Sequence, residues 1–214
     1  MNGTVTVVDY GLGNLFSVAH ALEKSAAQVV LTDKPDEIAR AERLVLPGVG
    51  AFYQGMQGLR ERDLIDPVLA FARSGRPMLG ICLGMQMLFT SSIEFGEHQG
   101  LGLIDGLIVP IQPLDENGNS LKVPHIGWRP LLQPPARASW GTSVLSGLSP
   151  GAHAYFVHSF TANPTHEADR LADAYYGSAR ISAAVQRDNI FGCQFHPEKS
   201  AGAGLRIIEA FLEL

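Results

Sequence analysis

The sequence predicts an α/β fold, with a central, mainly parallel sheet flanked by helices and an additional antiparallel portion in the C-terminal half. In the first half, short β-branched runs alternate with amphipathic stretches, as in strand–helix–strand units. After Gly96 the apolar segments become short and are separated by glycine, proline and asparagine, which is typical of antiparallel strands and hairpins. The 214 residues are expected to form one domain, 1–214, that buries its own core.

The elements are expected in this order along the chain. Asn14 can cap a helix in which Leu15, Val18 and Leu22 recur at helical spacing. In the first half, strands are predicted at 4–9, 28–31, 43–46 and 77–81, and helices after Asn14, at 35–40, at 51–74 with an interruption at Pro67, and from 83 to about 89. In the second half, strands are predicted within 101–111, 121–123, 154–161, 180–185 and 190–195, linkers at 114–120 and 133–139, and a final helix from about 203 to 212.

Composition and charge argue against several classes of protein. Sixteen basic and 21 acidic side chains give a net charge of −5 without a basic block, so nucleic acid is not an expected partner. No apolar run approaches the roughly 18 residues of a membrane span, and the first residues lack a secretory signal pattern. Cys82 and Cys193 do not suggest a disulfide framework, and neither H-E-x-x-H nor C-x-x-C occurs. We expect a cytoplasmic protein without a metal or cofactor.

The most specific local signal is the G-x-C-x-G sequence Gly80-Ile81-Cys82-Leu83-Gly84, between a predicted strand and a predicted helix. It is the cysteine counterpart of the nucleophile elbow. The glycines remove Cβ atoms where a tight turn brings backbones together, and the helix N-terminus favours a thiolate over a thiol. On this pentapeptide alone, a glycine-rich turn with an inert buried cysteine is an equal alternative.

A nucleophile needs a base, and His196-Pro197-Glu198 supplies a base together with a carboxylate that can orient it. In an extended chain, positions i and i+2 face the same side, so the Glu198 carboxylate is expected to reach the imidazole of His196. A surface pair is the alternative for the tripeptide by itself, but its occurrence together with the elbow favours a catalytic site.

The sequence Pro47-Gly48-Val49-Gly50 closes a third predicted strand. Glycines at this point allow backbone N–H groups to approach a developing oxyanion. An ordinary strand-to-helix loop explains this segment equally well when it is taken alone.

In this order, the elbow, P-G-V-G and H-P-E resemble the class I, triad-type glutamine amidotransferases. Further segments are similar to the glutaminase subunits of imidazole glycerol phosphate synthases, and the similarity covers essentially the whole chain. These segments are Asp9-Tyr10-Gly11-Leu12-Gly13-Asn14-Leu15, Pro124-His125-Ile126-Gly127-Trp128, Tyr155-Phe156-Val157-His158-Ser159-Phe160 and Gln194-Phe195-His196-Pro197-Glu198-Lys199-Ser200.

The resemblance implies a role for each matching residue. The implied catalytic triad, which would hydrolyse the side-chain amide of glutamine, is Cys82, His196 and Glu198. The implied oxyanion donors are backbone N–H groups of Val49, Gly50 and Leu83. The implied glutamine-binding residues are Gln86, Glu94, Ser159 and Phe160. Residues implied to line the partner interface or the ammonia passage are Trp128, Tyr155 and Lys199. Two positions depart from the family pattern: Arg129 stands where asparagine is usual, and Phe160 where tyrosine is common.

The resemblance also implies a partner, a (β/α)8-barrel cyclase subunit with which the chain would form a heterodimer. Ammonia would pass to that subunit, which would make imidazole glycerol phosphate and aminoimidazole carboxamide ribotide. In this family the P-G-V-G peptide is thought to need rearrangement, so glutaminase activity is expected to be weak until the partner and its nucleotide bind. The alternatives are the glutaminase of another synthase, a stand-alone γ-glutamyl hydrolase, and a non-catalytic binding subunit on the same scaffold.

Overall fold

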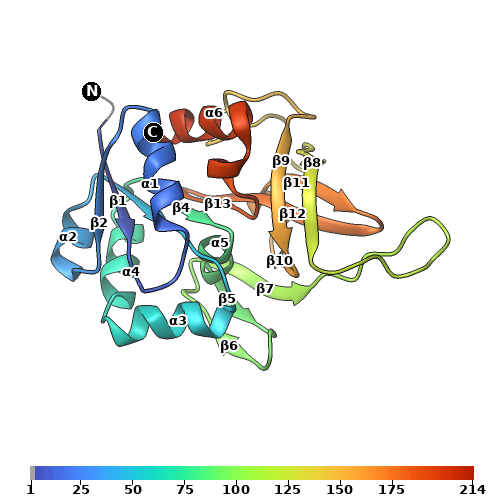
Figure 1. Ribbon diagram of the computed structural model, residues 1–214, viewed down its shortest axis with the longest axis horizontal. Helices are drawn as coiled ribbons and strands as arrows, with labels where there is room; N and C mark the ends of the chain where they lie inside the picture. Colours follow the sequence, from blue (N-terminus) through green and yellow to red (C-terminus); the bar gives the residue numbers. More distant parts are fainter. Residues whose placement is uncertain (1–2) are drawn as a thin grey trace.

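The computed structural model describes residues 3–214, and its centre is a seven-stranded sheet with the order β11-β12-β13-β4-β3-β1-β2 (Figure 1). The five strands from β13 to β2 are parallel, and β11 and β12 extend the sheet as an antiparallel pair. The strands are β1 (Thr4–Val8), β2 (Gln28–Thr32), β3 (Arg43–Leu46), β4 (Met78–Ile81), β11 (Arg170–Tyr176), β12 (Ala179–Arg187) and β13 (Ile190–Cys193).

Helices cover both faces of this sheet, and five of its strands, β1, β3, β4, β12 and β13, contribute side chains to both hydrophobic clusters. Leu44 and Leu46 of β3 pack into one cluster with the helices α2 to α5, whereas Val45 packs into the other with α1 and α6. This is the period-two alternation of a strand that is buried on both faces. The helices are α1 (Leu15–Lys24), α2 (Pro35–Arg40), α3 (Phe52–Glu61), α4 (Ile65–Arg73), α5 (Leu83–Met87) and α6 (Ala201–Leu212).

Two smaller sheets lie beside the main one in the second half of the chain (Figure 1). A four-stranded sheet has the order β10-β7-β5-β6, and a two-stranded antiparallel sheet pairs β8 with β9. Their strands are β5 (Phe89–Ser92), β6 (His98–Gln99), β7 (Ile104–Pro110), β8 (His125–Pro130), β9 (His153–His158) and β10 (Phe160–Pro164). Short 3-10 helices occur at η1 (Glu167–Asp169) and η2 (Pro197–Lys199).

The predicted α/β class is confirmed, and most predicted elements of the first half are present within one or two residues of their expected bounds. The prediction that the helical stretch is interrupted at Pro67 was wrong. The helical stretch breaks at 62–64, where Asp63 adopts a left-handed φ of 54°. Pro67 lies in the first turn of α4, where a missing N–H leaves no intrahelical hydrogen bond unmade. Asn14 precedes α1 but makes no side-chain cap.

In the second half, the strand predicted at 121–123 is absent, and pairing starts at His125 instead. Strands β5, β6, β8 and β11 have no counterpart in the sequence prediction. The segment predicted at 190–195 forms β13, which pairs in parallel with β4 and antiparallel with β12. It therefore belongs to the central sheet, not to a separate antiparallel region.

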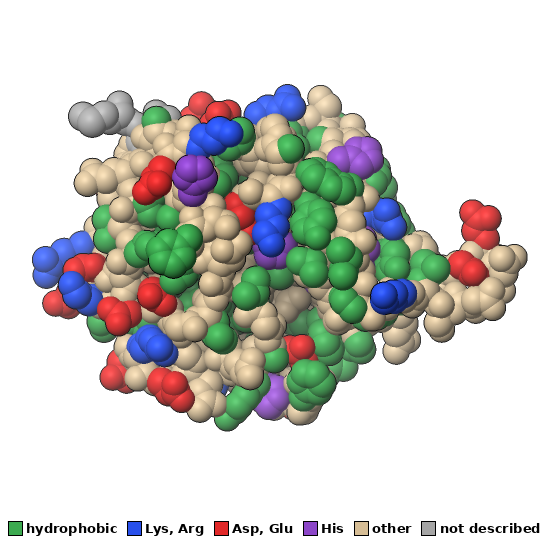
Figure 2. Space-filling view, viewed as in Figure 1, with side chains coloured by type: hydrophobic (Ala, Val, Ile, Leu, Met, Phe, Trp, Pro, Cys, Tyr) green, Lys and Arg blue, Asp and Glu red, His purple; other side chains and the backbone are tan. Residues whose placement is uncertain are grey.

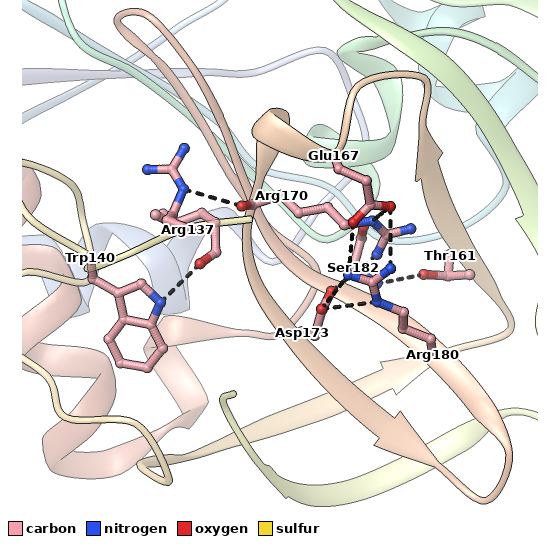
Figure 3. Close-up of polar contacts among 9 residues, drawn as sticks. Arg137, Trp140, Thr161, Glu167, Arg170, Asp173, Arg180 and Ser182 are labelled. Atoms are coloured by element: carbon pink, nitrogen blue, oxygen red, sulfur yellow. Dashed lines mark hydrogen bonds and ion pairs between the residues drawn. The ribbon is translucent and has the colours of Figure 1, made fainter. Parts of the chain in front are cut away.

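A buried ion-pair network joins β11, β12 and η1 (Figure 3). The Asp173 carboxylate accepts hydrogen bonds from Arg170 (3.1 Å) and from two nitrogens of Arg180 (2.9 and 2.7 Å). Glu167 lies at the exposed side of the network and contacts both arginines. The Asp173 side chain is 3% exposed and that of Arg170 is 5% exposed, so these charges compensate one another away from water.

The surface is mixed in charge, with two local features. The loop between β7 and β8 projects from the molecule (Figure 1), and acidic side chains lie at its end (Figure 2). The acidic residues of this loop are Asp115 and Glu116. Hydrophobic side chains gather over β8, where Val123, Ile126 and Trp128 are 42%, 57% and 44% exposed (Figure 2). Among the described residues, no helix has both the length and the apolar character needed to span a bilayer.

Candidate active site

Cys82 occupies a strained turn between β4 and α5. Its φ of 53° is a left-handed value that non-glycine residues rarely adopt, and its backbone N–H donates to the carbonyl of Cys193 (2.7 Å). The two flanking glycines are needed for close approach. A Cβ on Gly84 would lie 1.7 Å from the carbonyl oxygen of Leu46, and one on Gly80 would lie 2.7 Å from a backbone nitrogen. The structure therefore has the strand–turn–helix elbow that the sequence predicts.

His196 reaches Cys82 because β13 lies next to β4 in the sheet. The two strands are parallel, with Cys193 opposite Ile81, so the residues that follow each strand emerge at the same edge. The Nδ1 atom of His196 lies 2.8 Å from Oε1 of Glu198, and the two side chains are 3% and 2% exposed. The pair forms through the 3-10 turn Pro197–Lys199, not through the extended chain that the i, i+2 argument assumed.

The surroundings of His196 favour the charged form of its imidazole. Burial opposes the charge, but the neighbouring Cys82 and Glu198 outweigh it and raise the pKa of His196 to about 9. Nε2 has no hydrogen-bond partner within residues 3–214, so the ring atom on the Cys82 side is available to a reacting group. Because Nδ1 faces a carboxylate, the mobile proton of this ring is at Nε2.

The backbone of His196 is fixed from two directions. Its N–H donates to the carbonyl of Tyr155 (3.0 Å), and its carbonyl accepts from the hydroxyl of Ser200 (2.7 Å). The same hydroxyl accepts from the N–H of Tyr155 (3.0 Å). Strand β9 and the start of α6 therefore hold the base in place.

The predicted oxyanion donors do not converge in this structure. The N–H of Leu83 donates to the carbonyl of Gly48 (3.3 Å), so a carbonyl oxygen lies where an oxyanion would have to bind. The preceding carbonyl, of Pro47, accepts from the hydroxyl of the fully buried Tyr10 (2.6 Å). A Cβ does not fit at Gly48, because it would lie 2.1 Å from the hydroxyl of Tyr10. The Pro47–Gly50 segment is thus held with the carbonyl of Gly48 turned toward the elbow.

A cleft of about 310 Å³ opens beside Cys82. It collects the predicted nucleophile, the base, the oxyanion segment and all four predicted glutamine-binding residues. Its lining is Val49, Gly50, Cys82, Leu83, Gln86, Glu94, Pro124, Val157, His158, Ser159, Phe160 and His196. This volume is large enough for a single amino acid.

Two of the cleft residues are already hydrogen-bonded to the protein. One oxygen of Glu94 accepts from the N–H of Phe52 at the start of α3 (2.6 Å). The Nε2 atom of Gln86 donates to the carbonyl of Phe160 (3.2 Å) and to Oε1 of Gln194 (3.0 Å). These contacts fix both side chains before any ligand binds, which lowers the entropy lost on binding.

Three buried residues at the site were not among the predicted site residues. Tyr10 and Gln194 lie within segments that resemble the family, and the amide of Gln194, between a buried strand and His196, is a signal that could have marked it. His158 donates to the carbonyl of Phe160 (2.8 Å) and lies 3.0 Å from His125. Burial lowers the pKa of both histidines to about 4, with the charge of His196 adding to the effect at His158.

The predicted interface residues lie at one side of this site. Trp128 of β8 and Tyr155 of β9 pack edge to face, with ring centroids 5.9 Å apart. Lys199 is exposed at the end of η2, one residue from Glu198. Among residues 3–214, no group of three or more His, Cys, Asp or Glu side chains is placed to hold a metal ion.

This fold and site define a class of protein. The model of the class-I glutamine amidotransferase family matches residues 6–213, and the chain belongs to this family of enzymes. Two solved structures are similar over nearly all of both chains. A glutamine amidotransferase crystal structure has a TM-score of 0.71 at 19% identity, covering 97% of each chain. A structure of PurLQS from Thermotoga maritima has a TM-score of 0.72 at 21% identity, covering 100% of this chain and 99% of that one.

Curated relatives narrow the assignment to one branch of the family. The chain is 49% identical over 211 residues, 99% of each protein, to imidazole glycerol phosphate synthase subunit HisH 1 of Legionella pneumophila (strain Lens). It is 46% identical over 209 residues to subunit HisH of Syntrophotalea carbinolica, covering 97% of this chain and 98% of that one. The chain thus falls in the HisH branch.

Proposed function

We propose that this chain, acting as one domain over residues 1–214, is the glutaminase subunit of an imidazole glycerol phosphate synthase. It hydrolyses glutamine to glutamate and ammonia. The observation that carries the proposal is the meeting of Cys82, after β4, with the hydrogen-bonded pair His196–Glu198, after β13, in one small cleft. The full-length similarity to HisH subunits selects the synthase.

Acylation starts from a Cys82 thiolate beside the His196 imidazolium. The thiolate attacks the side-chain carbonyl carbon of glutamine, and the carbonyl oxygen takes the negative charge. As the C–N bond breaks, His196 gives its Nε2 proton to the departing nitrogen, which leaves as ammonia. Glu198 keeps Nδ1 protonated throughout and holds the plane of the ring. The product is a γ-glutamyl thioester on Cys82.

Deacylation uses the same residues, with His196 now accepting a proton instead of donating one. The imidazole of His196, now neutral, takes a proton from a water molecule that attacks the thioester carbon. The C–S bond then breaks, glutamate leaves, and the imidazolium–thiolate pair returns. No metal or cofactor is needed to balance these two steps.

Glu94 and Gln86 bind the amino-acid end of the substrate, together with the backbone of Ser159 and Phe160. The carboxylate of Glu94 is only 9% exposed and is anchored through one oxygen, so the other oxygen can accept from the α-ammonium group of glutamine. This places the side-chain amide of the substrate toward Cys82, deeper in the cleft.

Full activity requires the Gly48–Val49 peptide to turn, so that its carbonyl leaves Leu83 and the N–H of Val49 replaces it. Two N–H groups, from Val49 and Leu83, then face the oxyanion, with Gly50 giving the segment its freedom at φ 105°. We infer that binding of a (β/α)8 cyclase subunit, as a heterodimer, drives this turn. Trp128, Tyr155 and Lys199 lie on the side of the site that this subunit would cover and through which ammonia would leave.

The test is glutamate release by the purified chain, measured alone and then with a cyclase subunit and its ribulosyl nucleotide. The expected result is low activity alone and stimulation of roughly 100-fold or more, because each missing oxyanion donor lowers kcat by about 10²–10³. A Cys82→Ala control must abolish the reaction. High activity without a partner would identify a stand-alone hydrolase. Stimulation only by the synthase of another pathway would reassign the partner.

A further inference from the structure

A buried amide lies against the sulfur of Cys82 and has no part in the mechanism above. Gln194 follows β13, two residues before His196, and is fully buried. Its backbone N–H donates to the carbonyl of Ala183 on β12 (2.9 Å), so strand pairing continues through this position. Because a buried amide needs partners at both of its ends, the contacts of this side chain constrain which end faces Cys82.

The neighbouring groups fix the orientation of the amide. The side-chain atom of Gln86 that lies 3.2 Å from the carbonyl of Phe160 must be its nitrogen, because a carbonyl oxygen only accepts. That same nitrogen lies 3.0 Å from the Gln194 side chain, so the Gln194 atom facing it must be the oxygen. The nitrogen of Gln194 is therefore the atom that faces Sγ of Cys82, at 3.8 Å.

We propose that Gln194 is a positioning residue for the nucleophile: its Nε2–H donates to the sulfur of Cys82, favours the thiolate and fixes the direction in which it points. This inference rests on the proposed function. Cys82 is 7% exposed, so water contributes little to the stabilisation of a negative sulfur. The nearby His196 imidazolium contributes a positive charge, and Gln194 contributes the hydrogen-bond donor that the structure places against the sulfur.

The same geometry connects the nucleophile to the substrate. Both N–H groups of the Gln86 amide are used, one on Phe160 and one on Gln194. Its oxygen is the atom left for the ligand, and an acceptor there suits the α-ammonium group of glutamine. A chain of hydrogen bonds therefore runs from the ammonium subsite through Gln86 and Gln194 to the sulfur of Cys82.

The first variant is Gln194→Glu, which keeps an oxygen for Gln86, removes the donor that faces the sulfur and adds an ionisable carboxyl group. Gln194→Met, which adds no charge, shows whether loss of the donor alone produces the effect. The measurement is the rate of Cys82 alkylation by iodoacetamide as a function of pH, with Cys82→Ala as the blank for Cys193. We expect alkylation near neutral pH to fall about tenfold, because a hydrogen bond to a charged group contributes about this factor. The half-maximal alkylation pH is expected to move up by about one pH unit.

Steady-state kinetics supply a second readout. In the complex with the cyclase subunit, Gln194→Glu is expected to lower kcat about tenfold and to leave KM for glutamine within twofold, since the contact to Gln86 remains. Gln194→Met removes both contacts and is expected to lower kcat and raise KM. If Gln194→Glu does not fold, Gln194→Met takes its place in both measurements. Gln28→Glu on the exposed start of β2 is the matched control, adding the same charge far from the site.

An alkylation profile and a kcat within twofold of the unchanged protein, in a folded Gln194→Glu or Gln194→Met variant, would overturn the proposal. Alkylation needs neither glutamine nor a partner. A shifted alkylation profile in a chain without glutaminase activity would therefore contradict the proposed function and leave the role of Gln194 standing. An unshifted alkylation profile in a chain with glutaminase activity would contradict the role of Gln194 and leave the proposed function standing.

Discussion

Asp173→Asn removes a buried negative charge from between two guanidinium groups while keeping the size and shape of the side chain. In the network of Figure 3, one carboxylate accepts three hydrogen bonds, from Arg170 and Arg180, at 2.7 to 3.1 Å. The variant leaves Arg170, only 5% exposed, facing a neutral amide. The backbone hydrogen bonds between Asp173 and Leu132 are untouched, so the strand register should survive.

The size of the effect follows from burial. Removing one partner of a buried ion pair costs about 3–5 kcal/mol. Arg180 is 33% exposed and Glu167 still contacts both arginines, which argues for the lower end, about 3 kcal/mol. For a protein of this size, that loss corresponds to a Tm lower by roughly 6–12 °C.

The assay is urea unfolding followed by circular dichroism, with Glu167→Gln as the matched control. Glu167 belongs to the same network and loses the same charge, but its side chain is 54% exposed, so the expected loss is about 0–1 kcal/mol. Equal losses for the two variants would refute the reasoning that burial, not charge pairing as such, sets the energy. So would a loss below about 1 kcal/mol for Asp173→Asn with an unchanged m-value.

Three further predictions follow from the site and its neighbours. Glu198→Gln removes a carboxylate that helps hold the pKa of His196 at about 9. We therefore expect kcat to fall by a factor of roughly 10²–10⁴ and the alkaline limb of the pH–rate profile to move to lower pH. An unmoved limb would contradict this. Gly84→Ala should lower the free energy of unfolding in urea by about 3 kcal/mol or more, because the added Cβ would clash with the Leu46 carbonyl. Gly202→Ala in α6 is the control, because the added Cβ meets no other atom there and should leave stability unchanged or raise it. The lowered pKa of His158, about 4, means that the unfolded chain binds the extra proton first, so stability should fall as pH drops from about 6.5 toward 4. His158→Gln should flatten that part of the stability profile.

The sequence predicts the reacting groups well because each lies in a short, contiguous motif. The two glycines around Cys82 and the tripeptide ending at Glu198 carry their own backbone requirements, and the structure places both at one sheet edge. That these residues lie together could thus be predicted without knowing the order of the strands, and their catalytic roles stay a prediction.

The orientation of the peptide after Gly48 could not be predicted in the same way. It depends on the Tyr10 hydroxyl, 37 positions away in the chain, and on the N–H of Leu83. These are tertiary contacts that leave no local pattern. Strand β8 was missed for a related reason. Gly127 and Pro130 are typical of turns, and only pairing with β9 makes the segment extended.

The position of β13 between β12 and β4 has a consequence for synthesis of the protein. Cys82 is translated 114 residues before His196, the base that we propose for it, and the strand that precedes this histidine must enter the middle of a sheet. At ordinary elongation rates the gap lasts roughly 5 to 25 seconds. During that time a ribosome-bound chain has its thiol but not its base. On the proposed function, a complete catalytic triad therefore exists only when nearly the whole chain has been made, and a chain that ends before His196 lacks the proposed base.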